Sequence, residues 1–201
     1  MTQGTDTADA TTRQGGGYLG ATYNFLHRIP LSLRYTLATG DVVDRMPLPR
    51  SDGSGAAGLD VPQHQYRHTL DLTVGYRVDV RGAGCRFFFL PMLGPRALFL
   101  VDKVSPNWAL EGEVGGSLGV ASDELFEFTV FGAYARALAK QDKSLTVYGP
   151  LLGETRFGAE IVVRPEQRFG LALGYEGDLV IFQSQIATNH QLHGGVRVFF
   201  D

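Results

Sequence analysis

The sequence predicts an all-β protein whose strands form an antiparallel up-and-down β-barrel, and two observations carry this prediction. Apolar and polar residues alternate over long segments: residues 65–80 place apolar side chains on one face and mainly polar ones on the other. Side chains of a strand point alternately to opposite faces, so this period of two indicates one long amphipathic strand. Glycine is frequent, with 26 residues, and 11% of the chain is aromatic, which suits strands and turns rather than helices.

Nine segments show this alternation, each with one mainly apolar face. They are residues 17–27, 30–41, 63–81, 85–102, 107–121, 124–138, 144–164, 167–186 and 189–200. Long strands in one sheet are most stable when the sheet closes and leaves no free edge. Single-chain bacterial barrels have even strand numbers, so the nine segments leave three explanations open: one segment is divided or joined differently, a first strand lies upstream of residue 1, or the barrel closes in an unusual way. We expect eight strands, or alternatively ten.

The chain is expected to contain one domain. Residues 1–16 are polar and rich in Thr and Gly, and we expect a flexible N-terminal segment there, followed by a single barrel domain over residues 17–201. The longest connection, about residues 40–62, is rich in Gly, Ser and Pro. We expect it to be a mobile loop that is able to bind an external partner.

The kind of charged residue predicts which face of the strands lies inside. The chain has only three lysines, and Lys103, Lys140 and Lys143 all fall in expected loops or at strand ends. Arginine binds an enclosed carboxylate better than lysine does, because its planar fork contacts both oxygens. We therefore expect apolar faces toward lipid, a transmembrane barrel, and a lumen filled by Arg–carboxylate pairs. The expected lumen network is Arg34, Arg67, Asp71, Arg77, Glu111, Glu113, Glu127, Arg156, Glu160, Glu176 and Arg197.

Aromatic residues support the same orientation. Transmembrane barrels carry girdles of aromatic residues at both membrane interfaces. Aromatic residues lie toward strand ends on the apolar faces, and we expect them to form such girdles. They are Tyr18, Tyr35, Tyr66, Tyr76, Trp108, Phe126, Tyr148, Phe169 and Tyr175.

Residues 190–201 resemble the closing strand of a Gram-negative outer-membrane β-barrel, because they alternate and end on aromatic residues. In size and pattern the chain resembles the small OmpA/OmpX-type barrels from about residue 17 onward. This resemblance implies an outer-membrane location, outer-membrane lipid around the barrel, and recognition by the barrel-assembly machinery through Phe200. Asp201 departs from the pattern, in which the aromatic residue is last.

The expected function is non-enzymatic: a structural, surface-interaction or narrow-pore role in the cell envelope. One alternative is an outer-membrane hydrolase or acyltransferase that modifies lipids through rim histidines. These histidines are His64 and His68 near the start of the third segment and His190 and His193 near the start of the last, with Asp60, Asp178, Ser54 and Ser184 as possible partners. The fifth histidine, His27, lies in an expected tight turn. No G-x-S-x-G motif supports that reading. A soluble, lipocalin-like ligand-binding barrel is the other alternative.

Cofactors and metals are not expected. Cys85 is the only cysteine, so neither an internal disulfide nor a cysteine-based metal site can form. His190 and His193 fall on opposite faces of one strand, which argues against a shared metal ion. The formal net charge of -3 gives no reason to expect a nucleic-acid partner.

Overall fold

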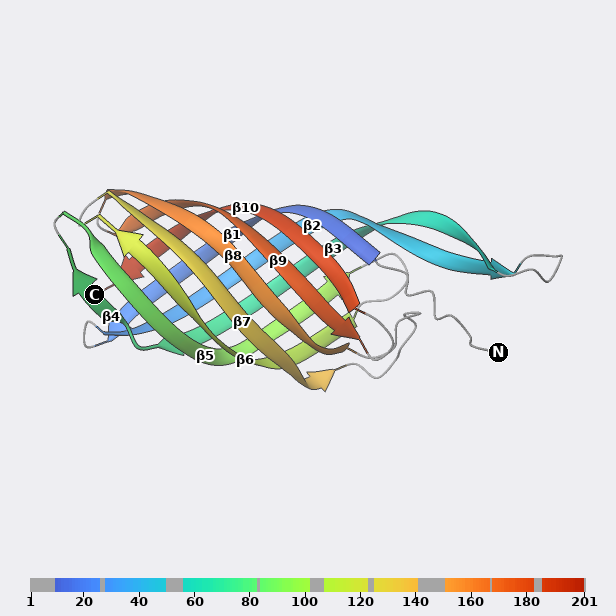
Figure 1. Ribbon diagram of the computed structural model, residues 1–201, viewed down its shortest axis with the longest axis horizontal. Coiled ribbons are helices and arrows are strands. Elements are labelled where there is room, and N and C mark those ends of the chain that lie inside the picture. Colours follow the sequence, from blue (N-terminus) through green and yellow to red (C-terminus); the bar gives the residue numbers. More distant parts are fainter. Residues whose placement is uncertain are drawn as a thin grey trace.

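The computed structural model describes residues 10–25, 28–49, 56–82, 84–101, 107–122, 125–140, 151–166, 168–182 and 186–200. Every regular element in these ranges is a strand, so none of them forms a helix that could span a membrane. The strands are tilted relative to the barrel axis and wrap into one barrel (Figure 1). Ten strands are defined: β1 Ala10–Phe25, β2 Ile29–Pro49, β3 Ala56–Gly75, β4 Val78–Arg81, β5 Arg86–Val101, β6 Asn107–Ala121, β7 Phe126–Lys140, β8 Leu151–Glu166, β9 Phe169–Phe182 and β10 Ile186–Phe200.

The barrel closes with nine strands, and the preference for eight was therefore wrong. All strand pairs are antiparallel except that of β1 with β10, which is parallel, and all but β1–β10 and β3–β5 join strands that are consecutive in sequence. β3 and β5 are adjacent in the barrel wall and pair with each other. The short β4 pairs only with β5. An odd number of alternating strands leaves the first and last strands pointing the same way, so a parallel pair is required at the point of closure. The nine alternating segments in the sequence match this count, with the third segment divided into β3 and β4.

The division between β3 and β4 is a local break rather than a new strand direction. Gly75 ends β3 and Val78 begins β4, and the backbone N–H of Tyr76 still donates to the Pro91 carbonyl of β5 at 3.1 Å. The Arg77 N–H turns instead to the Arg28 carbonyl in the β1–β2 turn, at 2.7 Å. The chain therefore leaves the main wall just after Gly75 while remaining attached to β5.

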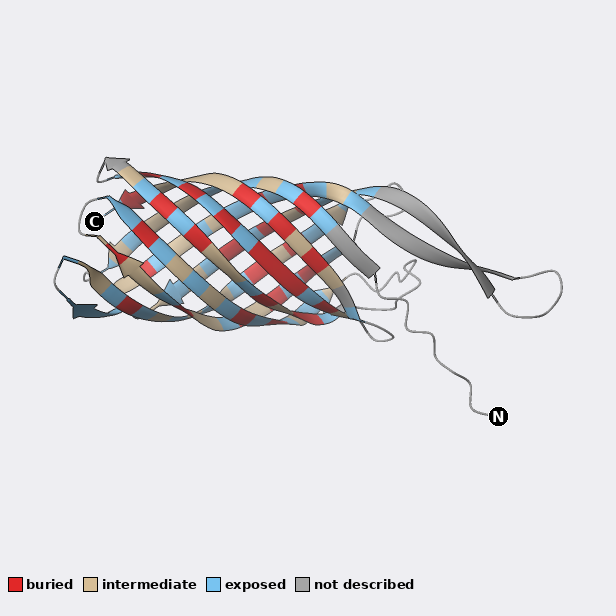
Figure 2. Ribbon diagram, turned by 45° about the horizontal axis from the view of Figure 1, so that its top comes forward, coloured by how far each residue is buried: buried red, intermediate tan, exposed pale blue. Residues whose placement is uncertain are grey.

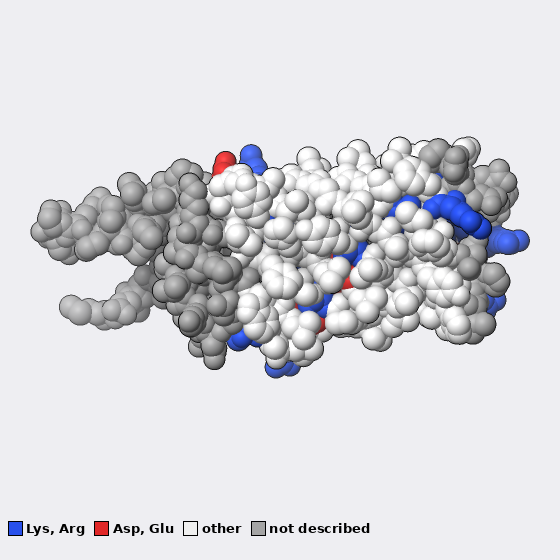
Figure 3. Space-filling view, turned by 180° about the vertical axis from the view of Figure 1, so that it is seen from behind, with Lys and Arg blue, Asp and Glu red and all other residues white. Residues whose placement is uncertain are grey.

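Burial alternates along the strands, as Figure 2 shows in bands of buried and exposed residues. The outward face carries most of the large apolar side chains, and Leu19, Leu118, Leu173 and Leu192 are each more than half exposed. The inward face carries most of the buried charges. Figure 3 shows uncharged atoms over most of the described wall, with a narrow diagonal strip of charged atoms and further charges toward the ends. The barrel is thus apolar outside and charged inside.

Two expected flexible segments contain strand structure. β2 and β3 continue past the barrel as a two-stranded ribbon, paired up to Pro49 and Ala56 (Figure 1). Most of the expected loop over residues 40–62 therefore belongs to strands, and residues 50–55 lie outside the described residues. β1 begins at Ala10, within the segment expected to be flexible, and pairs with Ala187 of β10.

A tyrosine fills the inside of the closing seam. Tyr18 of β1 is buried, which corrects its expected place in an outward aromatic girdle. A Cβ atom at Gly195 of β10 would lie 2.5 Å from the Tyr18 ring, so only glycine leaves room for that ring. The guanidinium carbon of Arg34 lies 4.2 Å from the ring centroid, and the His193 ring packs edge-on at 5.5 Å. Small residues on β10 thus let the parallel pair close around an inner aromatic side chain.

The parallel seam predicts two disulfides. Leu19 is the register partner of Val196, and Ala21 is the partner of Val198. After Cys85→Ser, both Leu19→Cys/Val196→Cys and Ala21→Cys/Val198→Cys should cross-link, because paired strands hold Cα atoms within disulfide range. Thiol titration and a gel shift under non-reducing conditions measure the yield. An antiparallel seam can satisfy at most one of these pairs, so cross-linking of only one pair would contradict the nine-stranded closure.

Candidate functional site

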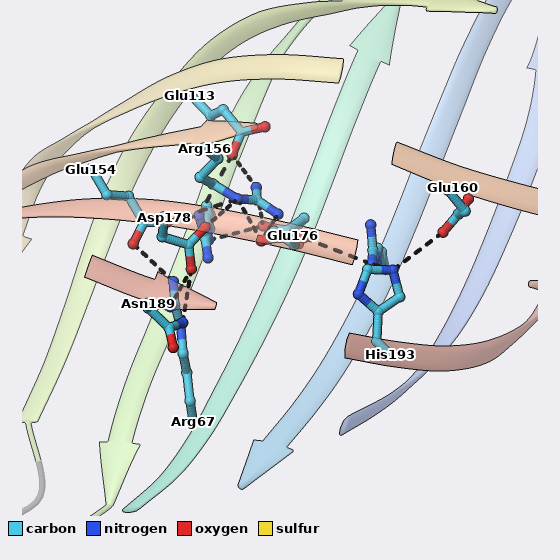
Figure 4. A network of polar contacts seen from close by, with 12 residues as sticks. Arg67, Glu113, Glu154, Arg156, Glu160, Glu176, Asp178, Asn189 and His193 are labelled. Carbon is cyan, nitrogen blue, oxygen red and sulfur yellow. Dashed lines mark hydrogen bonds and ion pairs between the residues drawn. The ribbon is translucent and has the colours of Figure 1, made fainter. Parts of the chain in front are cut away.

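A layer of buried ion pairs fills the middle of the barrel, and we call it the central charge layer (Figure 4). Arg156 of β8 lies near its centre. It donates to Glu113 of β6 at 2.6 Å and to Glu176 of β9 at 2.9 and 2.8 Å. The layer consists of Arg67, Arg96 and Arg156 with Asp71, Glu111, Glu113, Glu154, Glu176 and Asp178.

The other two arginines connect the opposite walls. Arg67 of β3 donates to Asp178 of β9 at 2.5 Å and to Glu154 of β8 at 2.8 Å. Arg96 of β5 donates to Glu154 as well, and its side chain is only 1% exposed. Glu154 and Asp178 are fully buried. Each arginine therefore ties strands that are distant along the sheet, because its side chain reaches across the lumen.

The central charge layer carries more negative than positive formal charge. It contains three arginines and six carboxylates, and Arg34 approaches its edge, 3.9 Å from Glu176. Glu111 is fully buried, with Arg96 at 3.9 Å. Neither Glu111 carboxylate oxygen has a hydrogen-bond partner within the described part of the chain. By formal charge, the layer therefore favours cations over anions.

A second group links the layer to the closing seam. His193 of β10 is buried, and its Nε2 lies 3.1 Å from the Arg34 guanidinium and 3.6 Å from Glu160. Glu160 also accepts a hydrogen bond from Arg197 of β10. His193 was expected at the rim, and that expectation was wrong. His193 shares a strand face with Gln191 and Arg197, because these residues are separated by even numbers of positions. This alternation could have placed the His193 side chain in the lumen.

A third group lies toward the end of the barrel that carries the short turns. Glu127 of β7 pairs with Arg164 at 3.2 Å and with Arg77 at 3.6 Å. Between this group and the central charge layer lies a cavity of about 160 Å³, lined by charged groups together with Phe88, Phe131 and Met92. A cavity of this size holds several water molecules. The lumen is therefore hollow near the short turns and filled by ion pairs at its middle.

The structure brings the expected lumen network together on the inner face. All of its members make at least one ion pair there. Sequence reasoning missed Arg96 and Glu154. It placed Asp178 at the rim as a possible partner of the histidines, which is wrong because Asp178 is fully buried beside Arg67. Glu154 lies two residues from Arg156, and Asp178 lies two residues from Glu176, so each pair shares a strand face. Alternation could therefore have placed Glu154 and Asp178 in the lumen. Arg96 lies in a segment whose neighbouring residues are apolar on both faces, which hid its orientation.

The remaining described histidines lie on the outward face near the rim opposite the short turns. The hydroxyl of Tyr35 lies 2.8 Å from His68 Nδ1, and the hydroxyl of Tyr175 lies 2.6 Å from His190 Nδ1. His64 of β3 contacts Thr39 and Asp41 of β2. His27, Tyr148, Asp60, Ser54 and Ser184 belong to positions whose side chains are not described.

No grouping suited to a metal ion is found in the described ranges. Cys85 is a free, partly exposed thiol in the β4–β5 turn. Phe200, the expected assembly signal, ends β10 and faces outward. None of these residues contacts the central charge layer.

Comparison with protein-family models, curated proteins and solved structures gives no match to this chain. The class that the fold defines is a closed, mixed β-barrel with a charged interior.

Removing one arginine from the central charge layer should destabilise the barrel strongly. Arg96→Met removes the guanidinium that Glu154 and Asp71 both contact, and it leaves Arg67 and Arg156 as their remaining cationic partners. Removing one partner from a buried ionic network costs about 3–5 kcal/mol. Equilibrium urea unfolding, followed by Trp108 fluorescence, measures the change. Arg96→Met/Glu154→Met should recover part of this loss, because both charges are removed.

Arg136→Met is the matched control. Arg136 is exposed on β7, and its replacement should change the free energy of unfolding by about 0.5 kcal/mol or less. Equal losses for Arg96→Met and Arg136→Met would contradict a structural role for the buried layer.

Proposed function

We propose that this protein is a transmembrane barrel of a Gram-negative outer membrane, with a lumen closed by ion pairs and a structural or surface-interaction role. The observation that carries the proposal is the sidedness of the wall, which is apolar outside and charged inside. In water this arrangement would expose large apolar side chains and bury charges, which is unfavourable on both counts. In lipid the same arrangement is the ordinary one for a barrel.

Strand length supports this placement. A strand that crosses a bilayer obliquely needs about 9–11 residues. The nine strands of the barrel wall range from the 14 residues of β9 to the 21 residues of β2. Aromatic residues lie outward near one rim, where Tyr66 and Trp108 are both exposed. Aromatic side chains with a polar group prefer the boundary between lipid and water. The wall therefore has both the height and the boundary residues that a membrane span needs.

The closed lumen argues for a structural role over an open pore. The arginines of the central charge layer reach carboxylates on β3, β6, β8 and β9, so their side chains cross the barrel at one level. Small barrels have interiors just wide enough for side chains to fill. A soluble lipocalin-like barrel would instead need an apolar interior for its ligand. A narrow pore remains the competing outcome of the conductance experiment below.

A charge on the outward wall tests for surrounding lipid. Leu173 of β9 lies between Ile161 and Gly194, well inside the wall, and is 67% exposed. Leu173→Arg should lower the free energy of unfolding in vesicles by about 2–4 kcal/mol, while Ile186→Arg at the start of β10 should cost about 0–1 kcal/mol. Urea titration in phospholipid vesicles measures both. If Leu173→Arg is neutral and the protein is monodisperse without detergent, the membrane placement is wrong.

Planar-bilayer recording tests the closed lumen. The wild-type protein should show no stable current steps, because the central charge layer blocks the barrel. Arg96→Ala/Glu154→Ala removes one buried pair of opposite charges, so it leaves the formal charge of the layer unchanged. It should produce cation-selective steps, since carboxylates remain in excess. Leu192→Ala, on the outer wall, is the control and should stay silent. Wild-type steps as large as those of the double variant would favour the narrow-pore alternative.

A further inference from the structure

Three polar residues on the outward face form a hydrogen-bonded chain. Asp41 of β2 is the register partner of His64 of β3, and their Oδ1 and Nδ1 atoms are 2.9 Å apart. The other ring nitrogen of His64, Nε2, lies 2.8 Å from the Thr39 hydroxyl oxygen. Thr39 and Asp41 are two residues apart on one strand, so both point to the same side. We call this group the Thr39–His64–Asp41 triad.

The order of these contacts is the one that activates a hydroxyl nucleophile. The Nδ1–H of His64 donates to Asp41, which leaves Nε2 free to accept the proton of the Thr39 hydroxyl. The carboxylate fixes the tautomer and orientation of the ring, and it stabilises the imidazolium that forms. Among the described histidines, only His64 has a hydroxyl on one ring nitrogen and a carboxylate on the other.

The triad is accessible. The side chains of His64 and Asp41 are 45% and 72% exposed, in contrast with the buried ion pairs of the lumen. The Tyr66 ring packs edge-on against His64 at 5.0 Å and holds the imidazole from the side. A substrate can therefore approach Thr39 from outside the barrel without entering the lumen.

The surroundings of the triad indicate the class of substrate. Leu37 and Leu70 lie further along the same two strands, on the outward apolar wall. Two residues along a strand span about 7 Å, so the apolar wall begins within that distance of Thr39. An acyl chain against this wall places its ester group beside the triad. Arg13, exposed and in register with Asp41, adds a cationic side chain to the same surface.

We propose that the Thr39–His64–Asp41 triad hydrolyses carboxylic esters of lipids at the outer boundary of the membrane; the lipid substrate, unlike the triad chemistry, rests on the proposed membrane placement. Thr39 Oγ1 attacks the ester carbonyl carbon while its proton passes to His64 Nε2. The leaving alkoxide takes that proton and departs as the alcohol, leaving an acyl–Thr39 ester. Water then attacks this ester with His64 as base, and the proton returns to Thr39 as the carboxylic acid is released.

The test uses the full-length protein and two substrates. A short-chain 4-nitrophenyl ester in detergent micelles reports triad chemistry without a bilayer, and diacyl phospholipid vesicles report lipid hydrolysis. A fluorophosphonate probe, followed by peptide mass spectrometry, identifies the nucleophile. We expect hydrolysis of both substrates and phosphonylation at Thr39. Thr39→Val, His64→Gln and Asp41→Asn should each lower the rate by at least about 100-fold.

Two control variants define the residue roles. Thr39→Ser keeps the hydroxyl and should retain activity, while His68→Gln removes a neighbouring outward histidine whose partner is Tyr35 and should leave the rate unchanged. If the wild-type rate equals that of Thr39→Val for both substrates and Thr39 is not labelled, the triad has no catalytic role and its hydrogen bonds are structural. Hydrolysis of the soluble ester alone by a protein that inserts into vesicles would overturn the lipid substrate. The same result with a protein that fails to insert would overturn the membrane placement and, with it, the lipid substrate.

Discussion

The fold depends on arginine side chains that bridge the lumen. Arg67, Arg96 and Arg156 start on β3, β5 and β8, and their carboxylate partners lie on β3, β6, β8 and β9. Because one buried charge without its partner costs several kcal/mol, the strands must meet in the register that satisfies all of these groups. A shift of any of these strands by one residue would turn its charges toward the outside and its apolar side chains inward.

The same constraint separates the barrel into an inside and an outside with different chemistry. The inside is charged and crossed by ion pairs at its middle, so it offers little room for a large ligand. The outside is mainly apolar along the wall and carries more polar side chains toward its ends, and at one of these ends Thr39, Asp41 and His64 meet. Any chemistry on a large substrate therefore has to take place at the rim or on the wall, and the lumen serves to hold the wall in shape.

Sequence alternation predicted the β-barrel, the nine segments and most of the inner charges, because the period of two survives as long as a strand is regular. It failed where that period is ambiguous. Arg96 follows apolar residues on both faces, and Tyr18 looks like an outward aromatic although Gly195 makes room for it inside. Pairing between strands was not visible either: the ribbon beyond the barrel depends on β2 and β3 supporting each other, and His64 meets Asp41 only through that register.

The parallel seam has a consequence for how the chain folds. β1 and β10 lie at opposite ends of the chain, and Ala10 pairs with Ala187. Contacts between residues so distant in sequence carry the largest loop-closure entropy and form slowly. During synthesis the first strand has no partner on one side until the last strand is complete. Until the two strands pair, the edge of β1 and the edge of the growing sheet stay open, so the newly made chain needs protection from pairing with other chains.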